Sequence, residues 1–150
     1  MIQRIQTLFL LCALVLTGLL YFLPIANITL DGTQCLYFVS KMVENNKAHN
    51  FIQWNTMTLI ANSIIMLFTF TSIFLYKKKF LSLQIRLSIV NSILNLGLIA
   101  LIWIQTKDID MTWKFELASV FPLVNFILIW IAIRNILKDY KVLKSLDRIR

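Results

Sequence analysis

The chain has 150 residues, of which 59% are apolar and 15% charged, and its mean hydropathy is +0.76. This apolar fraction lies well above the roughly one half found in soluble domains, so the composition excludes a soluble globular fold. The net charge of +8 would suggest a nucleic-acid partner for a soluble chain, but a membrane protein uses such a surplus mainly to set its orientation.

Four apolar segments are long enough to cross a membrane: residues 5–23, 54–76, 87–104 and 117–133. At 1.5 Å per residue, a helix of about 20 residues spans the roughly 30 Å hydrocarbon layer of a bilayer. We therefore predict an all-α membrane protein, a bundle of four transmembrane helices that forms a single domain over residues 1–150.

The first segment begins just after Arg4 and has the charge pattern of a signal peptide. Its apolar run is long, however, and no small-residue cleavage site follows Pro24. We therefore expect the first helix to remain as an uncleaved anchor.

The loop after the first segment contains a hairpin signal. Two β-prone stretches, IANITL at residues 25–30 and TQCLYFV at residues 33–39, flank Asp31 and Gly32. An Asp-Gly pair accommodates the positive φ angles that a two-residue hairpin turn requires. We predict a β-hairpin here. The rest of the loop, residues 40–50, is polar and fits either a short helix or an irregular return to the second segment.

The strongly polar side chains inside the four segments are amides. No Asp, Glu, Lys, Arg or His lies within the segments, which argues against a proton relay or ion-coupled transport. Three asparagines lie at a similar depth, roughly 14 Å from the outer ends of their segments, and a fourth lies one turn away. We predict that these side chains form an interhelical polar layer: Asn62, Asn91, Asn95 and Asn125.

This polar layer has two interpretations. The structural one is that the amides hydrogen-bond between helices and fix their register. The functional one is a polar cavity for a small ligand or a lipid headgroup. Polar side chains also recur at helical spacing on the second and third segments, so we expect these two faces to meet: Thr58, Asn62, Thr69 and Ser72 on one, and Gln84, Ser88, Asn91 and Asn95 on the other.

The stretch DIDMTWKFE, residues 108–116, alternates polar and apolar residues strictly, as a half-buried strand does. A two-stranded hairpin alone is marginal in water, and a third strand stabilises it. We predict that this stretch completes a small antiparallel sheet of about three strands, unless both loops are irregular and the alternation is chance. Its apolar row is Ile109, Met111, Trp113 and Phe115.

The fourth segment contains Pro122 and is followed by a basic tail, residues 134–150. A proline inside a span predicts a kink and leaves the carbonyl of Ala118 without its helical donor. The tail has the periodicity of an amphipathic helix that lies on anionic lipid or docks to a partner, such as an acidic protein or ribosomal RNA near the protein-translocation machinery. Its cations are Arg134, Lys138, Lys141, Lys144, Arg148 and Arg150.

The charges divide between the two sides of the membrane. One side, with both termini and the lysines at 77–79, carries eleven cations and two anions; the other carries four cations and five anions. The positive-inside rule places the first side in the cytoplasm. The outer loops, residues 24–53 and 105–116, and the predicted sheet are then extracytoplasmic.

The residues that catalysis and cofactor binding need are missing. The two cysteines, Cys12 and Cys35, are predicted at depths too different for a disulfide, and His49 is the only histidine. No metal-ligand spacing, nucleophile motif or phosphate-binding loop is present. We expect no enzymatic activity, no cofactor, no metal and no DNA partner.

Both ends of the chain carry a family likeness. The start, MIQRIQT, and the end, IRNILKDYKVLKSLDRIR, together with four spans, resemble a bacterial family of small four-span inner-membrane proteins of unknown function. The resemblance implies an inner (plasma) membrane location with periplasmic outer loops, and it implies no activity. The layout is also distantly similar to that of claudin-like proteins. The paired outer cysteines and tryptophan motif of claudins are absent, so this likeness concerns shape alone.

Two functional hypotheses follow from these observations. In the first, the chain is a non-catalytic accessory or scaffold subunit of a larger inner-membrane complex, with the periplasmic sheet and the basic tail as its contact surfaces. In the second, it is a transporter or channel that handles a small ligand or a lipid through the asparagine layer.

Overall fold

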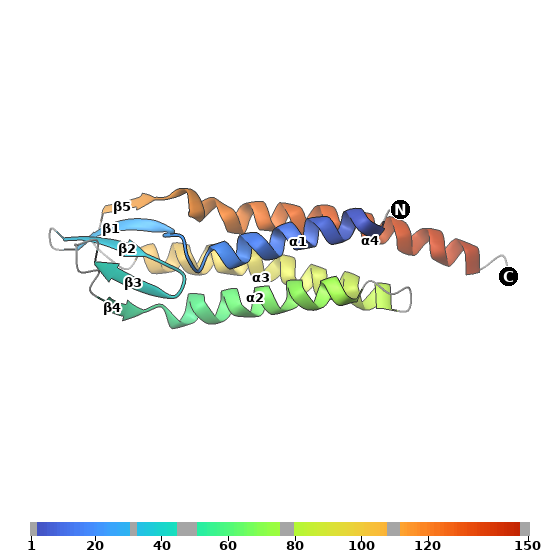
Figure 1. Cartoon of the computed structure of the whole chain (residues 1–150), viewed down its shortest axis with the longest axis horizontal. Coiled ribbons are helices and arrows are strands. Elements are labelled where there is room, and N and C mark those ends of the chain that lie inside the picture. The colour runs from blue at the N-terminus through green and yellow to red at the C-terminus, as the bar shows by residue number, and fades with distance from the viewer. Residues whose placement is uncertain (1–2, 31–32, 45–50, 76–79, 108–111, 148–150) are drawn as a thin grey trace.

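A computed structural model describes residues 3–30, 33–44, 51–75, 80–107 and 112–147. The described chain folds into four helices that lie side by side, with a small sheet at one end and both chain termini at the other (Figure 1). We call these ends the sheet end and the tail end. The helices are α1 (Gln3–Leu19), α2 (Thr56–Phe74), α3 (Leu81–Lys107) and α4 (Phe121–Asp147).

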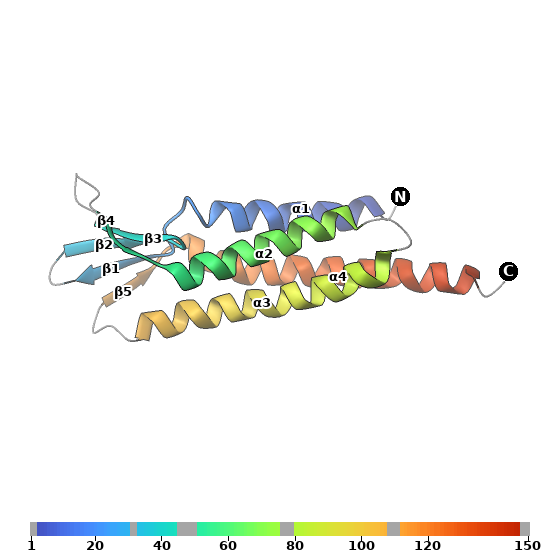
Figure 2. The same ribbon diagram turned by 90° about the horizontal axis from the view of Figure 1, so that it is seen from below.

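The helices contact one another in a ring. Helix α1 packs against α2 and α4, and α3 packs against the same two helices (Figure 2). Three of the helices are long and apolar enough to cross a membrane, at Thr56–Phe74, Leu81–Gln105 and Leu117–Val142, whereas the apolar part of α1 is shorter, at Ile5–Leu19. These lengths and compositions indicate a membrane protein.

Large apolar side chains cover the outside of the bundle. Ile60 on α2, Ile93 on α3 and Leu123 on α4 are each more than half exposed. A water-soluble protein of this size does not expose apolar side chains along the length of every helix, because contiguous apolar patches promote association. The distribution fits helices whose outer faces contact lipid.

The sheet has five strands in the order β4-β3-β2-β1-β5, and every neighbouring pair is antiparallel. The strands are β1 (Ala26–Leu30), β2 (Thr33–Tyr37), β3 (Lys41–Glu44), β4 (Phe51–Trp54) and β5 (Thr112–Phe115). The antiparallel sheet is therefore confirmed, but the predicted number of about three strands is wrong. The sequences of β3 and β4, KMVE and FIQW, do not alternate polar and apolar residues, so the usual sequence pattern of a strand is missing from both.

The predicted hairpin and closing strand pair as expected. Leu30 lies opposite Thr33, which leaves two residues between β1 and β2, and these lie outside the described residues. Strand β5 pairs with the other edge of β1, so that Ala26 lies opposite Phe115. Both loops thus contribute to one sheet, the layout on which the likeness to claudin-like proteins rests.

One face of the sheet packs on the helix ends. Ile28 and Tyr37 from the strands join Ile65 of α2 and Leu98 of α3 in a continuous buried apolar cluster. A hydrogen bond reinforces this contact: Thr58 Oγ1 of α2 donates to the Val39 carbonyl at 2.8 Å. The sheet therefore closes one end of the bundle with an apolar core.

Pro122 begins α4 instead of kinking it. A single 3₁₀ turn, η2 (Leu117–Val120), precedes the helix, and the N–H of Phe121 donates to the Ala118 carbonyl that sequence alone leaves without a donor. In the first turn of a helix the missing N–H of proline costs little, since that group has no intrahelical acceptor there.

Candidate functional site

The four asparagines singled out by sequence are buried in the middle of the bundle, each at most 1% exposed. They lie on three helices: Asn62 on α2, Asn91 and Asn95 on α3, and Asn125 on α4. We call them, with Thr17 and Thr69, the amide network.

Thr17 of α1 is the centre of the amide network. Asn62 Nδ2 donates to the Thr17 carbonyl at 3.2 Å, and Asn125 Nδ2 donates to Thr17 Oγ1 at 3.1 Å. Asn125 Nδ2 also donates to Asn95 Oδ1 at 3.1 Å. The structure thus brings Asn62, Asn95 and Asn125 together around one threonine, and the cluster joins all four helices.

Asn91 lies one turn closer to the tail end. Its Nδ2 donates to Thr69 Oγ1 of α2 at 2.8 Å, and its backbone carbonyl accepts from Asn95 Nδ2 at 2.9 Å. It therefore connects the central cluster to the interface between α2 and α3.

That interface continues toward the tail end as a row of buried polar side chains. Gln84 Nε2 donates to the Ser72 carbonyl at 2.9 Å, and Ser88 lies between Gln84 and Asn91 on the same face of α3. We call the set running from Gln84 to Asn95 on α3, with Thr69 and Ser72 on α2, the polar seam.

Thr17 is the member that sequence reasoning missed. Thr17 is the only buried polar residue in the half of α1 nearer the sheet end, so no repeating polar face marks it among the described residues. The available signal was depth, because Thr17 lies at about the same depth in the bundle as Asn62 and Asn125, to which it is hydrogen-bonded. A single hydroxyl in an apolar run does not reveal whether it faces lipid or protein.

The amide network contains no titratable group, so its chemistry is limited to neutral hydrogen bonding. Asn62, Asn91 and Asn125 donate to neighbouring helices and Asn95 donates to a carbonyl of its own helix, while several amide oxygens accept from no protein donor. Among the helix residues that the structure describes, the buried oxygens without a hydrogen-bond partner are Asn62 Oδ1, Asn91 Oδ1, Asn125 Oδ1, Gln84 Oε1, Ser72 Oγ and Ser88 Oγ.

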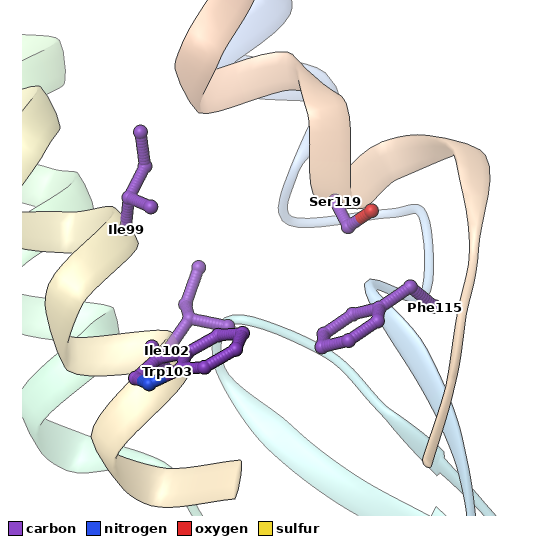
Figure 3. A pocket seen from close by; sticks show the side chains of 5 residues that line it. All are labelled: Ile99, Ile102, Trp103, Phe115 and Ser119. Atoms are coloured by element: carbon purple, nitrogen blue, oxygen red, sulfur yellow. The ribbon is translucent and has the colours of Figure 1, made fainter.

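The sheet end carries a small cavity of about 150 Å³. Ile102 and Trp103 of α3 line one side, and Phe115 of β5 and Ser119 of η2 line the other, with the Phe115 ring turned toward α3 (Figure 3). The lining is mostly apolar, and Phe115 remains half exposed. The cavity lies where the second loop rejoins the bundle.

The remaining predicted sheet residues are only partly described. Asp31, Gly32, Ile109 and Met111 lie outside the described residues, and Trp113 pairs with Ile28 through its backbone in β5. At the junction of the sheet and α3, the Tyr37 hydroxyl donates to Gln105 Oε1. Burial raises the pKa of Tyr37 above its ordinary value, and a hydrogen bond with Thr58 partly opposes the shift.

The predicted tail is the end of α4, which continues without a break to Asp147. Arg134, Lys138, Lys141 and Lys144 are all exposed, whereas positions 148–150, which include Arg148 and Arg150, lie outside the described residues. Gln6 of α1 donates a hydrogen bond to Asp139 of α4, and the end of α4 projects past the other three helices (Figure 1).

No group of three or more His, Cys, Asp or Glu side chains that could hold a metal occurs within the described part of the chain. Cys12 is exposed on α1 and Cys35 is buried in β2, and both are free thiols. His49 lies outside the described residues.

The family likeness inferred from the two ends of the chain is confirmed by comparison with known families. Residues 2–149 match the family described as Domain of unknown function (DUF4293). The chain belongs to this family. A search of curated protein sequences finds none that matches it. Membership of DUF4293 thus covers nearly the whole chain, including all the residues of the amide network, without assigning an activity.

Proposed function

We propose that this protein is a non-catalytic accessory or scaffold subunit of a larger complex in the bacterial inner membrane. In this proposal all four helices span the membrane, both termini are cytoplasmic and the sheet is periplasmic. The support for this orientation is the charge distribution, with eleven cations and two anions on the tail side.

The observation that carries the proposal is the course of α4 beyond the bundle. From Tyr140 to Asp147, past the hydrogen bond between Gln6 and Asp139, the helix continues for roughly 10 Å at 1.5 Å per residue. An amphipathic helix that rests on lipid lies in the plane of the interface. A straight continuation of a span instead carries Lys141 and Lys144 away from the headgroups, so we assign this end of α4 to a protein partner with an acidic surface.

The exposed surface of this projecting helix combines charge with apolar area. Lys138, Lys141 and Lys144 are exposed, and so are Tyr140 and Val142. A helix that stands free in water is marginal, and most helical stability comes from packing of an amphipathic face. A partner that covers Tyr140 and Val142 and pairs with the lysines would supply that packing.

The experiment is purification from the native membrane at native abundance in mild detergent, with cross-linking. We expect stoichiometric partners, and we expect Lys138→Glu, Lys141→Glu and Lys144→Glu together to release at least one of them. The matched control reverses Arg86, an exposed cation of α3 that belongs neither to the tail nor to the sheet. A monomer without a cross-linkable neighbour would refute the proposal, and a tail variant that keeps every partner would remove the tail as a contact surface.

A second function, a transporter or channel for a small ligand or lipid, is favoured by the buried amide oxygens that have no protein donor. It predicts that a chain in which Asn62, Asn91, Asn95 and Asn125 are replaced by leucine no longer complements deletion of the gene, although the protein is as abundant as the native one. If abundance falls instead, the amide network has only a structural role.

A further inference from the structure

The orientation of each amide in the amide network and the polar seam is fixed by its partner. Nδ2 of Asn62 and Asn95 and Nε2 of Gln84 each approach a backbone carbonyl, which can only accept. An amide oxygen in the same place would face another oxygen and repel it. These three side chains therefore cannot be flipped.

The same argument holds for the two amides that bond to threonines. Thr69 Oγ1 donates its proton to the Ile65 carbonyl at 2.8 Å, and Thr17 Oγ1 donates to the Ala13 carbonyl at 2.6 Å. Each hydroxyl has one proton, so toward Asn91 and Asn125 it can only accept. The amide nitrogens must point at these hydroxyls, and the amide oxygens must point elsewhere.

The consequence is a surplus of acceptors inside the bundle. Four amide oxygens, those of Asn62, Gln84, Asn91 and Asn125, accept from no protein donor, and the Ser72 and Ser88 hydroxyls next to them have no partner. All six side chains are at least nine-tenths buried. A buried acceptor without a donor loses the hydrogen bond that it makes to water in the unfolded chain, so a row of such acceptors favours an external donor.

We infer that the polar seam is a binding site for water, which enters between α2 and α3 from the tail end and stops at the central cluster. Water supplies two donors per molecule and is held by two to four polar partners, which the seam provides along its length. The described seam has no carboxylate to balance a bound cation, and an apolar ligand would leave the oxygens unpaired.

The two ends of the seam differ, and this difference gives the site its direction. At the tail end Ser72 and Gln84 lie within one turn of the connection between α2 and α3. At the sheet end the next inward residues of α3 are Leu98 and Ile102, which belong to the apolar cluster under the sheet. The proposed water site is therefore bounded by apolar packing at the sheet end. It is independent of the scaffold function proposed above.

The test is the reactivity of single cysteines with a charged, membrane-impermeant methanethiosulfonate, applied to each side of the membrane in turn. The reporters are Ser72→Cys and Ser88→Cys, which change one atom each and so preserve packing. Each reporter is placed in a chain that also carries Cys12→Ala and Cys35→Ala. If Cys35→Ala lowers abundance, the reporters are placed in the native chain instead, and the reactivity of the native chain without a reporter is subtracted.

Two matched controls lie on the same helix. Ile93→Cys faces outward, where Ile93 is 62% exposed, and Leu98→Cys lies in the apolar cluster. The thiolate is the reacting species, and apolar surroundings suppress it, so both controls should react slowly. We expect Ser72→Cys and Ser88→Cys to react at least about tenfold faster than either control, and only from the side of the α2–α3 connection.

Three results would overturn the inference. Equal, slow reaction of all four cysteines means that the seam is dry. Fast reaction from both sides means an open channel instead of a closed cleft. The reaction of Ser88→Cys with the methanethiosulfonate could also slow as the Na⁺ concentration rises, but not with an equal concentration of a bulky organic cation. That result means that a metal cation, instead of water, occupies the oxygens.

Discussion

Two of the four helix interfaces in the bundle differ in the side chains that they bury. Between α1 and α4, the buried side chains include Ala13, Ile129 and Ile133, which form an apolar cluster. Between α2 and α3, on the tail side of the central cluster, the buried side chains are polar, as in Thr69, Ser88 and Asn91. Both interfaces belong to the same bundle, and both pairs of helices have apolar outer faces.

The contrast shows which interactions stabilise each pair of helices in this protein. Lipid tails are as apolar as leucine, so an apolar side chain gains little by leaving lipid for the bundle interior. The α1–α4 interface therefore combines close packing, which Ala13 and Ala132 permit, with the hydrogen bonds of Asn125 to Thr17 and of Gln6 to Asp139. The α2–α3 interface gains from hydrogen bonds that lipid cannot offer.

The largest effect should come from removing packing volume at the α1–α4 interface. We expect Ile129→Ala to lower the free energy of unfolding by about 2–3 kcal/mol, the lower part of the range for buried isoleucine, since lipid replaces part of the lost transfer term. The control is Ile127→Ala on the same helix, where Ile127 is 48% exposed and the effect should stay within about 0.5 kcal/mol. Reversible unfolding in detergent measures both, and equal losses would contradict the assignment.

The next largest effect should come from the centre of the amide network. Asn125→Leu removes the donor to both Thr17 Oγ1 and Asn95 Oδ1. We expect a loss of about 1–2 kcal/mol, because Asn95 Oδ1 is then left buried without a donor. Val124→Leu, at the neighbouring outward position, should leave stability unchanged. An Asn125→Leu chain as stable as the native one would show that the network contributes no net stability.

A third effect distinguishes the sheet end from both interfaces through its pH dependence. The pKa of Tyr37 is raised by burial, so the unfolded chain loses this proton at lower pH than the folded one. The stability that Tyr37 contributes is therefore complete below about pH 10 and is lost as pH rises through the folded-state pKa. Tyr37→Phe should cost about 1 kcal/mol at neutral pH and reduce the alkaline loss. If Tyr37→Phe loses as much stability at alkaline pH as the native chain, the loss is due to other titratable groups.

The smallest effect should be the pairwise coupling across the polar seam. A double-mutant cycle with Asn91→Leu and Thr69→Val isolates the bond between these two side chains. We expect a coupling energy of about 0.6 kcal/mol, the average for hydrogen bonds between membrane helices. A value near zero would mean that Asn91 finds an equivalent partner once Thr69 is gone.

Much of the fold could be predicted because its signals are local. Asp31-Gly32 between β-prone stretches predicted the β1–β2 hairpin, and the alternation of DIDMTWKFE predicted the strand that pairs with β1. The meeting of the polar faces of α2 and α3 followed from helical spacing, since Asn91 donates to Thr69 and Gln84 to the Ser72 carbonyl.

The missed features depend on tertiary contacts. Strand β3 buries Met42 and Val43 only because β2 lies beside it, and no periodicity within KMVE marks it as a strand. Thr17 faces inward because Asn62 and Asn125 meet there, which the apolar sequence of α1 cannot reveal. Pro122 was misread because the 3₁₀ turn before it shifts the start of the helix.

The position of β1 in the sheet has a consequence for biosynthesis. Asn27 of β1 is bonded to Glu116, which follows it by 89 residues. At about 5–20 residues per second, a ribosome needs on the order of 5–20 s to supply the second neighbour of β1. During that interval β1 is paired only with β2 and presents an open edge to other nascent chains. The sheet is finished only when the start of the fourth helix has emerged, so its completion marks the arrival of the last segment of the bundle.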